Sequence, residues 1–215
     1  MSVVVKLCGL RRPEDVDAAI HAGADELGFI FYPSSQRHVS LTEASLLRAL
    51  VPSQRRVVAV TVDASDDELD AIAQFLQPDV FQLHGNESPH RVHEVKTRLQ
   101  RPVIKAIAVK NMQDVHAAER YEESADYLLF DTKHSSGASG GTGITFDWQL
   151  LHGFSSSLPW YVSGGLDADN VSEALRITAA RRVDASSRLE VAPGVKDAAK
   201  LSAFVLAAKA APAHP

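Results

Sequence analysis

Short apolar runs alternate with amphipathic segments along the whole chain. The runs are apolar at nearly every position, which is typical of strands that helices cover on both faces of a parallel sheet. We predict eight strands, at Val3–Cys8, Glu26–Phe31, Arg56–Val62, Val80–Leu83, Val103–Ile107, Tyr127–Asp131, Trp160–Ser163 and Arg182–Ala185. We also predict eight helices, at Pro13–His21, Thr42–Leu50, Asp66–Leu76, Pro89–Leu99, Met112–Tyr121, Asp147–Leu151, Ala168–Ile177 and Asp197–Lys209.

Several predicted helices carry start or stop signals at their ends. Pro13 occupies a first helical position and is followed by two acidic residues, which suits the helix dipole. Ser65 is followed three residues later by Glu68, the pattern of a capping box. Gly23 stands where the first helix should end. These local signals agree with the periodicity.

Eight strand–helix units in 215 residues predict an α/β fold, a single (β/α)8 TIM barrel with a parallel eight-stranded core that spans residues 1–215. The chain contains no linker, repeat or low-complexity block that would divide it. An open doubly wound sheet is the alternative. Such a sheet usually has a glycine-rich fingerprint after its first strand, and residues 8–13 do not carry one.

Composition narrows the class of protein. The net charge of −5 and the absence of a Lys/Arg-rich block argue against a nucleic-acid surface. Cys8 is the only cysteine, which excludes an internal disulfide and fits a reducing compartment. No apolar run approaches the roughly 20 residues that span a bilayer, and the N-terminus has no export signal. We therefore expect a cytoplasmic protein without nucleic-acid or membrane partners.

Polar residues follow the ends of the predicted strands. Cys8 ends the first strand, Asp131 ends the sixth and Asp184 lies in the eighth. In a barrel, the carboxyl ends of the strands form one rim, where catalytic residues collect. The sequence therefore predicts that these side chains share one site.

Cys8 and Lys6 form the first candidate pair. A lone cysteine is usually a small buried hydrophobe, so the case for chemistry depends on its place at a strand end. Lys6 lies two residues earlier and points to the same side of the strand. Its ammonium would lower the pKa of the thiol and help Cys8 to act as a base. The alternative for Lys6 is a pair with an inward-facing acid.

Asp131, Arg37 and His84 each allow two interpretations. Asp131 ends an otherwise apolar run, and a partly desolvated carboxyl group has a raised pKa that suits a general acid; the alternative is a cap. Arg37 is either a bidentate clamp for a carboxylate or a solvated loop residue. His84 either orients a group in the barrel mouth or is a hydrogen-bonded structural residue. No spacing of histidines and acids predicts a metal site.

The loops after the seventh and eighth strands predict a phosphate site. Gly164 and Gly165 follow Ser163 and precede a predicted helix, so backbone amides and the helix N-terminus could face an anion. Barrels often bind phosphate in these two loops, and Ser186 and Ser187 follow the eighth strand. The alternative is a plain tight turn.

These motifs together resemble the phosphoribosylanthranilate isomerases of tryptophan biosynthesis. The similarity covers essentially the whole chain, and the blocks occur in the family's order and spacing. They are Lys6-Leu7-Cys8-Gly9, Arg12–Asp15, Gly28–Arg37, Gln82–Gly85, Gly140–Gly143, Phe146–Trp148, Ser163–Leu166, Asp184–Ser187 and Ala192–Asp197.

The resemblance implies a barrel that needs no cofactor or metal and acts on a small phosphorylated sugar. The family carries out an Amadori rearrangement of N-(5-phosphoribosyl)anthranilate, and a homodimer is compatible with it. By position, Asp131 matches the general acid, Cys8 the general base and Arg37 the residue that holds the anthranilate carboxylate. The remaining matches are Gly164, Gly165, Ser186 and Ser187 in the phosphate loops and Asp184 near a sugar hydroxyl.

Three residues depart from the family's pattern. Leu10-Arg11 replaces the usual Ile-Thr, and Arg188 replaces the glycine that usually follows Ser186-Ser187. Losing that glycine removes backbone freedom if the position needs a positive φ. It also places a cation beside the predicted phosphate, so we expect Arg188 to contact the phosphate or close over it.

Two rival functions remain. The histidine-pathway isomerases, and the barrels that serve both pathways, resemble this chain in architecture but have a carboxylate where this chain has Cys8. A catalytically idle phosphate-binding barrel that acts as a scaffold is the rival from another class. The presence of both Cys8 and Asp131 argues against it.

Overall fold

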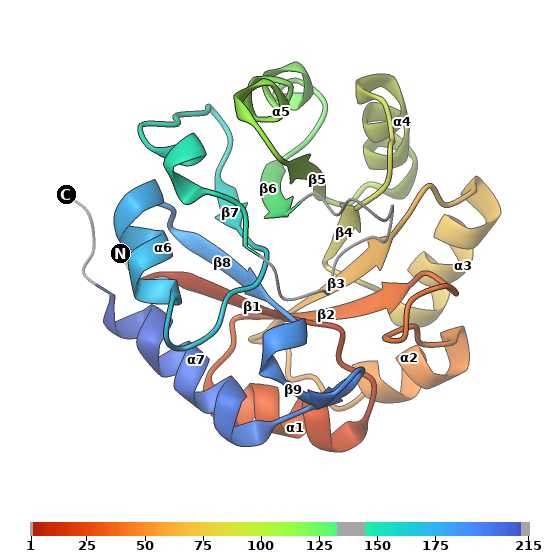
Figure 1. The fold of residues 1–215 in the computed structure, drawn as a ribbon. Coiled ribbons are helices and arrows are strands. Elements are labelled where there is room, and N and C mark those ends of the chain that lie inside the picture. Colours follow the sequence, from red (N-terminus) through yellow and green to blue (C-terminus); the bar gives the residue numbers. More distant parts are fainter. Residues whose placement is uncertain (1, 133–144, 212–215) are drawn as a thin grey trace.

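The computed structural model describes residues 2–132 and 145–211, and it shows a closed barrel of eight parallel strands in chain order (Figure 1). The predicted (β/α)8 barrel is thereby confirmed. The strands are β1 (Val4–Cys8), β2 (Glu26–Phe31), β3 (Arg56–Thr61), β4 (Val80–Leu83), β5 (Val103–Val109), β6 (Tyr127–Thr132), β7 (Trp160–Val162) and β8 (Arg182–Ala185).

Helices surround the barrel (Figure 1). The α-helices are α1 (Pro13–Ala22), α2 (Leu41–Arg48), α3 (Asp66–Leu76), α4 (Pro89–Leu99), α5 (Met112–His116), α6 (Val171–Thr178) and α7 (Ala198–Ala210). Single turns of 3-10 helix occur at η1 (Glu119–Tyr121), η2 (Trp148–Leu151) and η3 (Ser187–Leu189). The capping box at Ser65 is present, and Gly23 ends α1 with φ 88°.

The helices differ from the prediction in three places. The fifth divides into α5 and η1, because the chain tightens to a 3-10 turn in which Tyr121 donates to Ala118. The sixth, predicted at Asp147–Leu151, is the 3-10 turn η2. Helix α6 begins three residues later than expected, because the Asn170 side chain binds the backbone of Gly165 and Asp167 and holds that loop outside the helix.

A short hairpin after β8 was not predicted. Its strands β9 (Glu190–Ala192) and β10 (Val195–Lys196) pair antiparallel and lie between η3 and α7. Helix α7 then packs against α1, and β8 pairs with β1, so the two ends of the chain close the barrel together. The hairpin brings charged residues close to the end of β1.

Apolar side chains fill the space inside the barrel and the layer between the strands and the helices. The inner cluster consists of Cys8, Val58, Val60, Val80, Ile104, Ala106, Leu129 and Tyr161. The barrel is therefore a packed core, with Cys8 as a member at the carboxyl end of its strand. No described helix is long and apolar enough to cross a membrane.

A polar cluster occupies the amino ends of the strands. Glu26, whose side chain is 1% exposed, accepts from Arg56 at 2.9 Å and from the Tyr161 hydroxyl at 2.8 Å. Arg182 lies 3.6 Å from the same carboxylate. The guanidinium groups of Arg56 and Arg182 both lie over the ring of Tyr127. Every member starts a strand or lies one residue inside it, so the cluster seals that end of the barrel.

The matched block Gly140–Gly143 lies outside the described residues, and so do residues 212–215.

Candidate active site

One cavity opens at the carboxyl ends of the strands, and every site residue predicted from the sequence lines it. The predicted residues are Cys8, Arg37, Asp131, Gly164, Gly165, Asp184, Ser186, Ser187 and Arg188. His84 and Gln82 line it too. The candidate acid Asp131 and the candidate base Cys8 therefore line the same cavity, as their positions at strand ends predicted.

Cys8 lies in a buried, charged environment. Lys6 is fully buried and donates to Asp184 at 2.9 Å, so the alternative interpretation of Lys6, a pair with an inward acid, is present. Burial raises the pKa of the Cys8 thiol; Lys6 and Lys196 lower it and Asp184 raises it, with a net shift upward. The expected lowering of the thiol pKa by Lys6 exists but burial outweighs it. The surroundings of Cys8 therefore favour the neutral thiol over the thiolate.

Gly28 gives the thiol its space. It is the register partner of Cys8 on the neighbouring strand β2. A Cβ atom built on Gly28 would lie 2.9 Å from the Cys8 sulfur and 3.2 Å from the Lys6 ammonium. Any side chain at this position would displace the sulfur or the ammonium.

Asp131 is held by groups from its own strand β6 and from the end of β4. The backbone N–H of Thr132 donates to its Oδ1 at 2.8 Å, and Nε2 of His84 lies 3.2 Å from its Oδ2. Gln82 donates to Nδ1 of His84 at 2.8 Å, which leaves Nε2, the nitrogen beside Asp131, to carry the proton of the neutral ring. His84 thus does orient a group in the barrel mouth.

Asp131 and Thr132 leave no room for a side chain at Gly164. Its φ is +86°, and a Cβ atom on it would lie 2.3 Å from the Thr132 hydroxyl oxygen and 2.9 Å from Oδ1 of Asp131. Gly165 follows with φ +63°, so two successive backbone amides turn within one loop. Neither amide donates to a residue in the described ranges, and successive amides of this kind form an anion site. The N-terminus of α6 is farther away than predicted, because that helix begins at Val171.

Arg188 joins the two predicted phosphate loops. Its Nη1 donates to Asp167 at 2.7 Å, which links the loop after β8 to the loop after β7 at the cavity edge. The backbone of Arg188 does not adopt a positive φ, so the arginine replaces the family's glycine without strain. Whether its side chain also contacts a phosphate stays a prediction.

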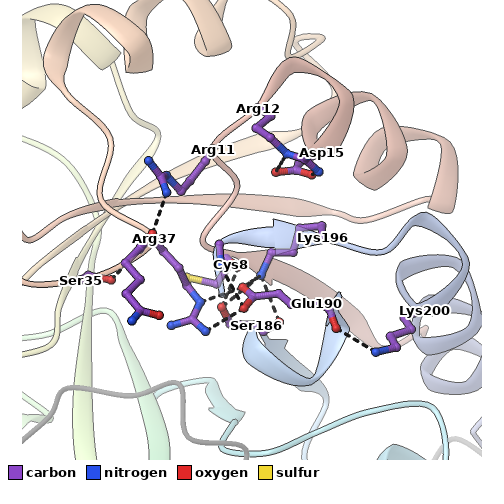
Figure 2. A network of polar contacts seen from close by, with 12 residues as sticks. Cys8, Arg11, Arg12, Asp15, Ser35, Arg37, Ser186, Glu190, Lys196 and Lys200 are labelled. Atoms are coloured by element: carbon purple, nitrogen blue, oxygen red, sulfur yellow. Dashed lines mark hydrogen bonds and ion pairs between the residues drawn. The ribbon is translucent and has the colours of Figure 1, made fainter. Parts of the chain in front are cut away.

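Arg37 makes a bidentate pair, but with a protein carboxylate. Its Nε and Nη2 donate to the two oxygens of Glu190 at 2.7 and 2.8 Å (Figure 2). Glu190 therefore takes up the bidentate edge formed by Nε and Nη2, and binding of a substrate carboxylate by Arg37 stays a prediction. Arg11, the second departure from the family pattern, donates to the Gln36 carbonyl at 2.8 Å and holds the loop that carries Arg37.

Two functional candidates escaped the sequence argument, Glu190 and Lys196. Lys196 donates to Glu190 at 2.9 Å and to the carbonyl and hydroxyl oxygens of Ser186 at 3.0 and 3.2 Å. Ser186 donates in turn to the Cys8 carbonyl at 2.9 Å. Lys196 lies within the matched block Ala192–Asp197, but neither its charge nor that of Glu190, two residues before the block, indicated a role.

The described residues contain no group of three or more His, Cys, Asp or Glu side chains that could hold a metal ion. The donors at the cavity are instead cations, amides and hydroxyls. Such donors suit a substrate that carries negative charge at both ends.

Comparisons with known proteins agree along the whole chain. A family model described as N-(5'-phosphoribosyl)anthranilate (PRA) isomerase matches residues 5–207. The N-(5'-phosphoribosyl)anthranilate isomerase of Parvibaculum lavamentivorans is 47% identical over 215 residues, which cover 98% of this chain and 100% of the relative.

Two solved structures are similar in fold and sequence. One is a phosphoribosyl anthranilate isomerase in complex with reduced 1-(o-carboxyphenylamino)-1-deoxyribulose 5-phosphate, with a TM-score of 0.83, 32% identity, and coverage of 96% of this chain and 98% of that chain. The other consists of monomers generated from the dimeric phosphoribosylanthranilate isomerase of Thermotoga maritima, with a TM-score of 0.85, 33% identity and the same coverage.

Proposed function

The chain belongs to the N-(5'-phosphoribosyl)anthranilate isomerase family, and on this premise we propose that its cavity converts N-(5-phosphoribosyl)anthranilate into 1-(2-carboxyphenylamino)-1-deoxyribulose 5-phosphate. The reaction is an Amadori rearrangement, an intramolecular aldose–ketose isomerisation in tryptophan biosynthesis. The observation that carries the proposal is the presence of Cys8 and Asp131 in one cavity between a glycine-rich loop and Arg37.

Asp131 starts the reaction as the general acid. It gives a proton to the furanose ring oxygen while the lone pair of the anthranilate nitrogen forms a C=N bond to C1, and the C1–O bond breaks. The product is an open-chain Schiff base with a positive nitrogen. The contacts from His84 and Thr132 hold the carboxyl group in place for this transfer. The raised pKa expected for Asp131 stays a prediction.

Cys8 then acts as the general base. Its thiolate takes the proton from C2, the electron pair forms the C1=C2 bond, and the C=N electrons return to nitrogen. The resulting enolamine tautomerises: the C2 hydroxyl loses its proton, C1 gains one, and the ketone forms. Burial disfavours the thiolate, and the charges of Lys6 and Lys196 offset only part of that penalty.

The substrate is held at its two charged ends. Gly164, Gly165, Ser186 and Ser187 would bind the phosphate, with Arg188 at the edge of that subsite. Arg37 would bind the anthranilate carboxylate, and Asp184, fixed by Lys6 and Ser163, would face a sugar hydroxyl. Two anchors at the ends keep the reacting carbons between acid and base.

The test is a fluorescence assay that follows the loss of freshly prepared phosphoribosylanthranilate. We expect turnover by the wild type, and its loss in Cys8→Ser and in Asp131→Asn. Equal rates in the variants, or no rate in the wild type, would favour a catalytically idle phosphate-binding barrel. Turnover of the histidine-pathway substrate would favour the other rival. A homodimer and a cytoplasmic location stay predictions, to be measured by light scattering and by fractionation.

A further inference from the structure

Glu190 lies at the centre of a buried ionic cluster beside the candidate base. Its side chain is 4% exposed and sits between Arg37 and Lys196 (Figure 2). The backbone N–H of Gly194 donates to its Oε2 at 3.1 Å, so both carboxylate oxygens accept two hydrogen bonds. Burial opposes ionisation of Glu190, but these donors outweigh it and its pKa is lowered. The carboxylate is therefore charged and fixed.

Glu190 determines which edge of Arg37 remains available. A guanidinium has five N–H donors, and Nε and Nη2 each use one on Glu190. The three others, two on Nη1 and one on Nη2, have no partner in the described part of the chain. They belong to a side chain that lines the cavity. Gly9 adds a second constraint, since a Cβ atom there would lie 2.7 Å from Cδ of Arg37.

The cluster carries an excess of positive charge. Arg37 and Lys196 contribute two cations against the one carboxylate of Glu190, and the Lys196 side chain is 1% exposed. Lys200 and Arg11 lie at its margin, where they bind the carbonyls of Glu190 and Gln36. A buried excess of about one charge beside a cavity favours an anion there. Glu190 thus does not cancel the attraction of Arg37 for a carboxylate.

We infer that Glu190 is a positioning residue that makes Arg37 selective for the carboxylate of the substrate. Its two hydrogen bonds fix the plane of the guanidinium, so that the N–H groups that Glu190 does not bind are directed to the cavity. Because Lys196 ties Glu190 to Ser186, and Ser186 binds the Cys8 carbonyl, the same cluster fixes this anchor relative to the base. The inference rests on the proposed function, in which Arg37 binds the anthranilate carboxylate.

Replacing Glu190 by glutamine separates geometry from charge. Burial already lowers the pKa of Lys196 and the negative charge of Glu190 works against that shift, so Lys196 gives up its proton more readily in the variant. The variant therefore keeps at least the one positive charge of Arg37. The variant loses the two charge-assisted hydrogen bonds that fix the guanidinium of Arg37. It therefore loses the preorganisation of Arg37, but it keeps the electrostatic attraction for a carboxylate.

The experiment measures the dissociation constants of two ligands by calorimetry. One is reduced 1-(o-carboxyphenylamino)-1-deoxyribulose 5-phosphate, and the other is the same compound without the ortho-carboxylate. The ratio of the two constants reports recognition of the carboxylate alone. We expect the wild type to prefer the carboxylate at least about tenfold and Glu190→Gln to lose about tenfold of that preference. Binding of the ligand without a carboxylate should change less than about twofold, because it does not use Arg37.

Two further variants keep the test decisive. Glu190→Asp retains the charge and the fold but cannot span both Arg37 and Lys196, so the ratio should fall by about threefold. Glu26→Gln is the matched control, a buried glutamate between two arginines at the far end of the barrel, and it should keep the wild-type ratio. Thermal unfolding shows which variants are folded. If Glu190→Gln is unfolded, the ratio measured for Glu190→Asp decides the test.

An unchanged or larger ratio in both Glu190 variants would overturn the inference, because Glu190 would then be a bystander or a competitor for Arg37. A wild type without any preference would refute Arg37 as the carboxylate anchor and the inference with it. If the wild type shows no turnover but still prefers the ligand with the carboxylate, and that preference still depends on Glu190, only the proposed chemistry would be refuted.

Discussion

Two buried glutamates at opposite ends of the barrel are each held by two cations, yet their surroundings differ. At the amino end, Glu26 binds Arg56, Arg182 and the Tyr161 hydroxyl, and both arginines lie over the Tyr127 ring. At the carboxyl end, Glu190 binds Arg37 and Lys196, and Arg37 also lines the cavity.

The difference lies in what the second cation of each cluster contacts. Around Glu26, Arg182 lies over the faces of Tyr127 and Tyr161, and cation–π contacts of this kind stabilise the fold without binding a ligand. Around Glu190, the surplus cation faces the cavity. The same arrangement of one carboxylate and two cations therefore closes one end of the barrel and keeps the other open to an anion.

The largest effect is expected at the reacting groups of the carboxyl end. Asp131→Asn removes the acid proton and Cys8→Ala removes the base, so each should lower kcat about a thousandfold. Neither replaces a residue of the Glu26 cluster, and we expect melting temperatures close to that of the wild type. Steady-state kinetics and thermal unfolding measure the two quantities. Near-normal kcat in either variant would show that the cavity does not use these groups.

The next effect tests the space around Asp131. Gly164→Ala drives a methyl group against the Thr132 hydroxyl, the Thr132 backbone nitrogen and the Asp131 carboxyl oxygen, and we expect kcat/KM to fall about a hundredfold as Asp131 moves with its neighbour. Gly153→Ala is the control, because Gly153 has φ +72° but no atom within 4 Å of an added Cβ. Both variants should lose about 1 kcal/mol of stability to the left-handed backbone, and Gly164→Ala should lose more because of the steric conflict. Equal kcat/KM in the two would remove the steric argument.

Glu26→Gln should have the opposite signature from the changes at the cavity. It leaves Arg56 and Arg182 without a charged partner, and we expect a loss of about 2 kcal/mol in the free energy of unfolding. The value is below that of a fully buried pair because the arginine side chains are 34% and 20% exposed. Urea denaturation measures it. Turnover should stay at the wild-type level, and a large fall would mean that the two ends are coupled.

Cys8 offers a pH measurement because it is the only thiol in the chain. Burial raises its pKa above the ordinary value, so the thiolate fraction, and with it the rate of alkylation by iodoacetamide, should still be rising beyond pH 9. Lys6→Met removes a charge that lowers this pKa, and should slow alkylation about tenfold at a given pH. Lys110→Met, at an exposed position, is the control. A rate that levels off below pH 9 would contradict the raised pKa.

The smallest effect is expected at the edge of the phosphate subsite. Arg188→Gly breaks an ion pair with Asp167 whose arginine is 43% exposed, so we expect KM to rise about threefold with little change in kcat. Inhibition by inorganic phosphate should weaken in parallel. An unchanged or lower KM would mean that the arginine contributes nothing to holding the substrate.

Much of the fold could be predicted because its strands are apolar runs with clear ends. Arg56, Val80 and Arg182 begin strands where expected, since burial on both faces leaves a continuous signal. The hairpin at 190–196 could not be predicted, because strands of three and two residues are too short to show a period. The candidate site followed from one rule, that the carboxyl ends of the strands share a rim.

The rule could not reveal how the predicted residues are paired. The Arg37–Glu190 pair joins positions 153 residues apart, so no local sequence pattern indicates that the guanidinium of Arg37 already binds a carboxylate of the protein. The pKa of Cys8 depends on the balance between burial and three charged neighbours, of which only Lys6 is near in sequence. Residue types and strand ends predict membership of a site, whereas contacts between distant segments determine protonation and orientation.

Closure of the barrel by β1 and β8 also has a consequence for biosynthesis. The partners of the first strand, Asp184 for Lys6 and Ser186 for Cys8, lie 178 residues downstream, so they leave the ribosome long after the strand they bind. We expect a nascent chain that stops before residue 180 to expose Cys8 to alkylating reagents and oxidants. Protection of this one sulfur would then mark the moment at which β8 has joined β1.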